Sequence, residues 1–143
     1  MTDNEQPKKP EAQKYKPLDV LIVEDVDQML KLLEHVVGGI KGLAVSGLAK
    51  NGWEARIEIT KRRPDVILLD EILPGESAVD LLNEFQSQGI PVILVTGVDK
   101  PTHEVPANAL GRIVKPGWRA IDVEQRRMGK AIFGFLRRPQ PAE

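Results

Sequence analysis

Short apolar runs alternate along the chain with longer segments in which apolar residues recur every three or four positions. The runs cover residues 20–23, 43–48, 66–69, 92–95 and 113–114. Mostly apolar runs of this length are typical of strands that are buried on both faces of a parallel sheet. The pattern therefore predicts five strands.

The segments between these runs have the spacing of amphipathic helices. The first helix has one apolar stripe, formed by Met29, Leu32, Leu33, Val36, Val37 and Ile40. Asp27 is its predicted N-cap, and Gly38 and Gly39 are its predicted end. Further helices are predicted over residues 53–61 and 121–138, and another around Val79, Leu82 and Phe85. Residues 98–110 contain two prolines and little periodicity, which predicts a short or irregular fourth helix.

Strands that alternate with helices in this way indicate an α/β fold, a doubly wound five-stranded parallel sheet with helices on both faces. The chain has 143 residues, enough for one domain, which we place at residues 17–138. Residues 1–16 and 139–143 are polar and proline-containing, so we expect them to be disordered tails.

Composition excludes several classes of function. Twenty Lys and Arg residues balance 21 Asp and Glu residues, which argues against direct DNA binding. The sequence has no cysteine, so disulfides and thiolate chemistry are excluded. Its longest fully apolar run is too short for membrane insertion, and its N-terminal segment lacks the apolar stretch of a signal peptide. We therefore expect a cytoplasmic protein.

Chemically active side chains follow four of the five predicted strands. Glu24 and Asp25 follow the first, Asp70 the third, Thr96 the fourth and Lys115 the fifth. Because parallel strands end at one edge of a sheet, these side chains should converge there. Three carboxylates without His or Cys favour Mg²⁺. Asp70 is the candidate nucleophile for an aspartyl-phosphate, with Lys115 neutralising the phosphoryl charge and Thr96 donating its hydroxyl.

The order of these motifs resembles the receiver domain of two-component response regulators. The resemblance rests on residues 21–25 (LIVED), 64–70 (PDVILLD) followed by Pro74, 92–97 (VILVTG) and 114–116 (VKP), with Asn51, Gly52 and Ala55 at the second helix start. It covers residues 17–138 and implies the flavodoxin-like receiver fold.

The resemblance also implies roles for individual residues. Mg²⁺ would be held by Glu24, Asp25, Asp70 and the backbone carbonyl of Ile72. Asp70 would be phosphorylated by a sensor histidine kinase or a phosphotransfer protein. Lys115 would pair with the phosphoryl group, and its peptide bond to Pro116 would be cis.

The expected function is that of a single-domain response regulator. It is a phosphoacceptor rather than a metabolic enzyme, and it catalyses its own phosphoryl transfer and a slow dephosphorylation. Its output would be altered contacts with a downstream protein, or a phosphorylation-dependent dimer. The alternative is a receiver-like interaction module that works without phosphorylation. A dehalogenase-type hydrolase is disfavoured because Ile72 stands where that class needs a second Asp.

The sequence departs from the receiver pattern at a few positions. Arg112 stands where the family has a switch aromatic, so we expect a different switch in which Arg112 moves toward an acid. Ile72 and Val98 occupy the positions that influence self-dephosphorylation, and their apolar side chains cannot orient an attacking water. This predicts a long-lived phosphoryl state. Trp53 is expected to pack at a helix start.

Overall fold

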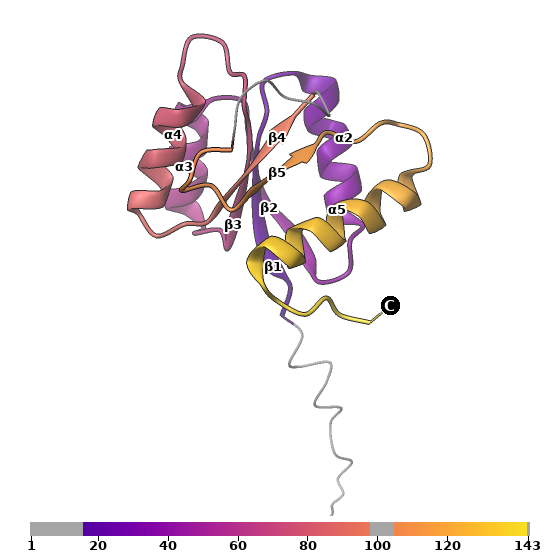
Figure 1. Ribbon diagram of the computed structural model, residues 1–143. Helices are drawn as coiled ribbons and strands as arrows, with labels where there is room; N and C mark the ends of the chain where they lie inside the picture. Colours follow the sequence, from indigo (N-terminus) through magenta and orange to yellow (C-terminus); the bar gives the residue numbers. More distant parts are fainter. Residues whose placement is uncertain (1–15, 98–104, 143) are drawn as a thin grey trace, which may run out of the picture.

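A computed structural model describes residues 16–97 and 105–142 and contains one parallel sheet of five strands (Figure 1). The strands are β1 (Leu18–Val23), β2 (Leu43–Ala49), β3 (Val66–Asp70), β4 (Val92–Thr96) and β5 (Gly111–Val114). Their order across the sheet is β2-β1-β3-β4-β5, and every neighbouring pair is parallel. This confirms the predicted doubly wound sheet, whose order reverses between β1 and β3.

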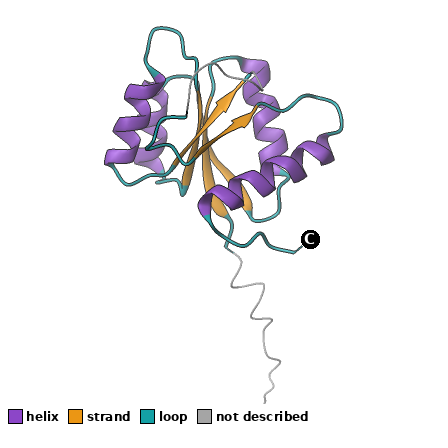
Figure 2. Ribbon diagram, in the orientation of Figure 1, coloured by secondary structure: helices purple, strands orange, loops and turns teal. Residues whose placement is uncertain are grey.

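Four helices within the described ranges cover the two faces of the sheet (Figure 2). They are α2 (Asp27–Gly38), α3 (Gly52–Lys61), α4 (Ala78–Ser87) and α5 (Ile121–Leu136). Helices α2 and α5 pack on one face, and α3 and α4 pack on the other (Figure 1). None of the helices in these ranges is long and apolar enough to cross a membrane.

The strands are mostly apolar because the sheet is covered on both faces and contributes to two cores. Val20 and Ile22 of β1 lie in the core under α2 and α5, whereas Leu21 and Val23 lie in the core under α3 and α4. Side chains alternate between the faces of a strand, so a sheet covered on both sides needs apolar residues at most positions of its central strands. Phe85 of α4 is fully buried in the second core.

The ends of α3 and α4 follow ordinary capping chemistry, but α2 begins differently from our prediction. Asn51 and Ser77 accept hydrogen bonds from backbone N–H groups in the first turns of α3 and α4. The predicted N-cap of α2, Asp27, is wrong: Asp27 is the first helical residue, and Val26 precedes it without a side-chain cap. Asp27 instead forms an ion pair with Lys50. The predicted end at Gly38 and Gly39 is confirmed.

Two apolar residues lie elsewhere than predicted. Val79 was assigned to the buried stripe of α4 but is 51% exposed, because Leu81 takes the inward position beside Leu82. Trp53 does not pack at the start of α3 and is 70% exposed. A regular helix turns by 100° per residue, so small errors in its predicted start move residues at the edge of the stripe.

The segment between β4 and β5 is described only in its second part. Residues 105–110 form turns rather than a helix, and the rest of the predicted irregular helix over 98–110 lies outside the described residues. The predicted disordered tail over 1–16 also lies almost wholly outside them. Residues 139–142 have no regular structure, and Pro141 lies beside Gly42.

Candidate functional site

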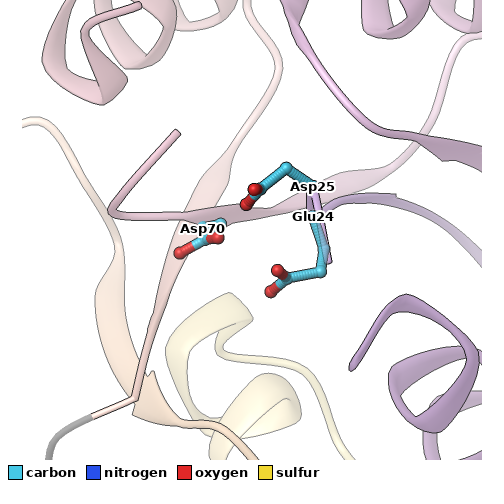
Figure 3. Close-up of side chains that lie close together, drawn as sticks. All are labelled: Glu24, Asp25 and Asp70. Carbon is cyan, nitrogen blue, oxygen red and sulfur yellow. The ribbon is translucent and has the colours of Figure 1, made fainter. Parts of the chain in front are cut away.

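Three carboxylates meet at the carboxyl edge of the sheet (Figure 3). Glu24 and Asp25 directly follow β1, and Asp70 is the last residue of β3. Because β1 and β3 are hydrogen-bonded neighbours, with Val23 opposite Leu69, the two strand ends lie side by side. One oxygen from each carboxylate lies within 4.8 Å of the others, as the order of strands predicted.

Glu24 is a fully buried carboxylate with one poorly satisfied oxygen. Its backbone N–H donates to the carbonyl oxygen of Ala49, which extends β1 along β2. Its Oε2 accepts a hydrogen bond of 3.1 Å from the N–H of Val26. Its Oε1 lies 2.8 Å from the ammonium nitrogen of Lys115 but has no partner of hydrogen-bond geometry in the described part of the chain. A buried anionic oxygen in this state favours an additional cation.

Asp70 is almost as deeply buried, with 3% of its surface exposed. Its Oδ1 accepts a hydrogen bond of 3.0 Å from the N–H of Ile72 and lies 3.2 Å from the Lys115 nitrogen. Burial raises the pKa of Asp70 to about 6, and the charge of Glu24 adds to the rise, against the opposing effects of Ile72 and Lys115. Asp70 is therefore an anion at neutral pH, but one that gains from further positive charge.

Lys115 follows β5 and brings an ammonium group between Glu24 and Asp70. Its backbone N–H donates to the carbonyl oxygen of Thr96, which fixes the start of its side chain at the edge of the sheet. Burial lowers the pKa of Lys115, but the close contact with Glu24 and the charges of both acids outweigh this and raise it. Lys115 is therefore a permanent cation within the site.

The predicted cis bond between Lys115 and Pro116 is wrong, because no peptide bond within residues 16–97 and 105–142 is cis. The trans form is the lower in energy for most X–Pro bonds. Lys115 reaches both acids with its peptide bond in this form, so the ion pairs do not depend on the rarer isomer.

Thr96 is the last residue of β4 and is 6% exposed. The register places its neighbour Val95 directly opposite Asp70 on β3 and Ile113 on β5. Thr96 thus lies at the same edge of the sheet as the carboxylates and Lys115. All five side chains that the sequence predicted for the site therefore lie in this region: Glu24, Asp25, Asp70, Thr96 and Lys115.

The donor set fits a divalent metal ion. Three carboxylates offer only oxygen ligands, their oxygens are close enough to share one ion, and Glu24 has an oxygen with unused acceptor capacity. Hard oxygen ligands of this kind suit Mg²⁺, which keeps several of its waters. Ile72 begins the loop after β3, and the role of its carbonyl as a further ligand stays a prediction.

The sequence predicted that Arg112 moves toward an acid, and the structure shows it already paired with one that the sequence did not name, Glu71. Arg112 of β5 donates two hydrogen bonds to Glu71, from Nε to Oε1 at 2.8 Å and from Nη2 to Oε2 at 2.5 Å. Only 9% of the Arg112 side chain and 20% of the Glu71 side chain are exposed. The two residues are 41 positions apart, and only the strand order, which puts β4 between them, shows that they can meet.

Comparison with known proteins identifies the family. Residues 20–120 match the response regulator receiver domain. The chain belongs to this family. Phosphorylation on an aspartate is typical of receiver domains, which act in two-component signalling and interact with histidine kinase domains.

Individual relatives agree with this assignment. A protein-glutamate methylesterase/protein-glutamine glutaminase of Syntrophus aciditrophicus is 32% identical over 116 residues, which are 76% of this chain and 33% of that protein. The receiver therefore spans about a third of the length of this relative, whose name describes an enzyme.

Solved structures share the fold. The response regulator domain of Thermotoga maritima CheB has a TM-score of 0.69 at 23% identity, covering 88% of this chain and 100% of that domain. One chain of the crystal structure of the P1 domain of CheA3 in complex with CheY6 from R. sphaeroides has a TM-score of 0.68 at 21% identity, covering 82% of this chain and 98% of that chain.

Proposed function

We propose that this receiver accepts a phosphoryl group on Asp70 from a sensor histidine kinase or a phosphotransfer protein. The observation that carries the proposal is the pairing of a buried Asp70 carboxylate with the Lys115 ammonium, 3.2 Å away, beside two further acids. A structural carboxylate needs one partner. A cluster of three acids and one lysine instead has the charges that phosphoryl transfer requires.

The reaction is a single displacement at phosphorus. An oxygen of the Asp70 carboxylate forms the new P–O bond while the bond from phosphorus to the donor breaks. With phosphohistidine as donor, the electron pair of the P–N bond stays on the ring nitrogen. The imidazole leaves as the neutral ring when its other nitrogen is protonated, and otherwise takes a proton from water. The product is an acyl phosphate on Asp70.

Several residues of the receiver would assist this step. Glu24, Asp25 and Asp70 would hold Mg²⁺, together with the carbonyl of Ile72, and the ion would supply positive charge to the phosphoryl oxygens. Lys115 would pair with one of these oxygens. Thr96 would donate its hydroxyl to another, an interaction available only after transfer.

Exposed apolar side chains around the site support a docking partner. Val26, Trp53, Ile72 and Trp118 follow β1, β2, β3 and β5, and they are 52%, 70%, 78% and 61% exposed. All four thus lie at the edge of the sheet that holds the carboxylates. Exposed aromatic side chains such as Trp53 and Trp118 are enriched in protein interfaces. This surface suits a phosphodonor domain that must exclude water from the transfer.

The proposed role in the cell follows from this chemistry. The receiver domain, residues 17–138, would act in the cytoplasm, where ATP-dependent histidine kinases carry their phosphoryl groups. It would signal through altered contacts with a downstream protein or through a dimer, and it would not bind DNA itself. It would catalyse only its own phosphorylation and slow dephosphorylation.

Intact mass spectrometry tests the proposal. The protein is incubated with a small acyl phosphate, with Mg²⁺ or with a chelator, and compared with Asp70→Asn. Asp122→Asn is the matched control, because Asp122 is an exposed acid of α5 that pairs with Arg126. We expect one phosphoryl adduct that requires Mg²⁺, is retained in Asp122→Asn and is lost in Asp70→Asn. A folded wild-type protein without an adduct would instead support an interaction module that works without phosphorylation.

A further inference from the structure

The Glu71–Arg112 ion pair connects two segments that the acceptor carboxylate also connects. Glu71 lies between Asp70 and Ile72, and Arg112 lies on the strand that leads to Lys115. Oδ1 of Asp70 contacts both the N–H of Ile72 and the nitrogen of Lys115. One carboxylate oxygen and one ion pair therefore join the loop after β3 to β5.

The register of the sheet shows how the pair reaches across β4. Leu69, Leu94 and Arg112 form one row across β3, β4 and β5. Glu71 is two residues beyond Leu69, so it belongs to the same face of the sheet by the alternation of strand side chains. Its N–H donates to the carbonyl oxygen of Val95 at 3.1 Å, which keeps its backbone on β4. Two strand spacings are roughly 10 Å, and the long side chains of Glu71 and Arg112 span them.

The pair is well placed to be sensitive to charge. It is bidentate and mostly shielded from water, so it is screened less than a surface pair and responds more strongly to a nearby charge. Phosphorylation replaces the single negative charge of the Asp70 carboxylate with the roughly two of a phosphoryl group, a net gain of about one negative charge on the residue next to Glu71. This charge repels the Glu71 carboxylate and attracts the Arg112 guanidinium. Both effects favour separation of the pair.

Phosphorylation also alters the contacts that hold the two segments in place. The acyl oxygen of a phosphorylated Asp70 carries less negative charge than a carboxylate oxygen, so its hydrogen bond to Ile72 weakens. Lys115 has a new and stronger partner in the phosphoryl oxygens. Oδ1 of Asp70 then no longer joins the loop that carries Glu71 to the end of the strand that carries Arg112.

We propose that the Glu71–Arg112 pair is a clasp that holds β5 against the acceptor loop at rest and opens when Asp70 is phosphorylated. The inference rests on the proposed function and names the regulation of that site. Arg112 and Glu71 act here as positioning residues, because the proposed phosphoryl transfer does not require either of them to contact the phosphoryl group. Opening of the clasp would link the added charge at the end of β3 to a loosening of β5 and of its contacts with β4.

Hydrogen–deuterium exchange of residues 111–115 tests the clasp, with and without the small acyl phosphate and Mg²⁺. We compare the wild type with Glu71→Gln and Arg112→Gln, and with the swap Glu71→Arg/Arg112→Glu. Glu84→Gln is the matched control, because Arg56 and Glu84 form another bidentate pair, on α3 and α4. Thermal unfolding confirms that each variant is folded. If Arg112→Gln does not fold, the comparison of the wild type with Glu71→Gln is sufficient for the test.

At rest, we expect Glu71→Gln and Arg112→Gln to exchange these amides about tenfold faster than the wild type, as loss of a charge-assisted hydrogen-bonded pair predicts. The swap should restore protection, and Glu84→Gln should match the wild type. After phosphorylation the wild type should approach the exchange rate of the variants, whose own rate should change little.

Two outcomes would overturn the clasp. One is equal protection of these amides in the wild type and Glu71→Gln at rest. The other is the same rise on phosphorylation in both proteins. Intact mass measured on the same samples separates these outcomes from failure of the proposed function, in which the wild type takes up no phosphoryl group at all. Exchange measured without the phosphodonor, in the wild type and in Glu71→Gln, tests the Glu71–Arg112 pair whether or not Asp70 can be phosphorylated.

Discussion

The ammonium nitrogen of Lys115 lies 3.2 Å from Oδ1 of Asp70, at the end of a strand two places away in the sheet. It also pairs with Glu24, so a single cation offsets part of the charge of two buried acids. The geometry gives Lys115 two successive tasks. It stabilises the carboxylates at rest, and it is in reach of any group that becomes attached to Asp70.

Replacement of Lys115 by Gln should slow phosphorylation of Asp70 at least about tenfold, because the transferring group loses a fixed positive charge. The measurement is the rate of adduct formation by intact mass at saturating Mg²⁺. Lys61→Gln provides the control, since Lys61 is an exposed lysine paired with Glu58 on α3. An unchanged rate in folded Lys115→Gln would exclude this role for Lys115.

Asp70→Asn should stabilise the protein at pH 7.5 in the presence of a chelator. The pKa of Asp70 is raised from 3.8 to about 6 on folding, so the folded state disfavours the charged form. The cost of this charge is present above about pH 6 and disappears below about pH 4, where the carboxyl group is protonated in both states. We expect a gain of about 2 kcal/mol in the free energy of unfolding at pH 7.5.

The pH dependence of the difference in unfolding free energy between the wild type and Asp70→Asn shows whether the charge of Asp70 causes it. Chemical denaturation of the wild type and Asp70→Asn at several pH values should show the difference shrinking as the pH falls from 6 to 4. A gain that is constant with pH would point to packing of the Asn side chain rather than to charge. Asp122→Asn should show no such gain.

Mg²⁺ should raise the midpoint of thermal unfolding at pH 7.5, because it binds the folded carboxylate cluster and not the unfolded chain. The shift should decline as the pH falls through about 6, where Asp70 becomes protonated and no longer serves as a ligand. Asp25→Asn should weaken the apparent affinity at least about tenfold by removing one charged ligand. A shift that persists in Asp25→Asn would mean that Mg²⁺ binds elsewhere.

Ile72 should prolong the phosphoryl state. Its side chain is 78% exposed directly after the acceptor strand and has no polar atom to position an attacking water. We expect Ile72→Asn to shorten the lifetime of the phosphorylated protein roughly several-fold, because the Asn amide can hydrogen-bond to an attacking water and orient it. Loss of the adduct after removal of the donor is followed by intact mass.

The control for Ile72 is Ile57→Asn, which changes an exposed isoleucine within α3 in the same way. It should leave the lifetime unchanged. Rapid loss of the phosphoryl group from the wild type, without any phosphatase, would contradict the predicted long-lived state. Val98, the other residue on which that prediction rests, lies outside the described residues.

The sequence by itself determined the sheet and the identity of the acidic cluster. Strands buried on both faces are nearly continuous apolar runs, which makes the runs before Glu24, Asp70 and Thr96 easy to recognise. Parallel strands end at one edge, so the residues that follow them are brought together whatever the details of packing. This is why Lys115 could be placed beside Asp70 from the sequence.

Local details were less predictable. The N-cap of α2, the exposure of Val79 and Trp53 and the isomer of the bond before Pro116 each depend on a few dihedral angles and on contacts with distant residues. Patterns of residue type do not encode these contacts, because several local conformations have similar energies until the tertiary structure selects one.

Only the tertiary structure revealed the Glu71–Arg112 pair and the rise in the pKa of Asp70 to about 6. Both depend on how close side chains from separate strands come and on how much water the fold removes around them. The interaction of two charges varies with their separation and with the surrounding dielectric, and neither quantity exists until the chain has folded.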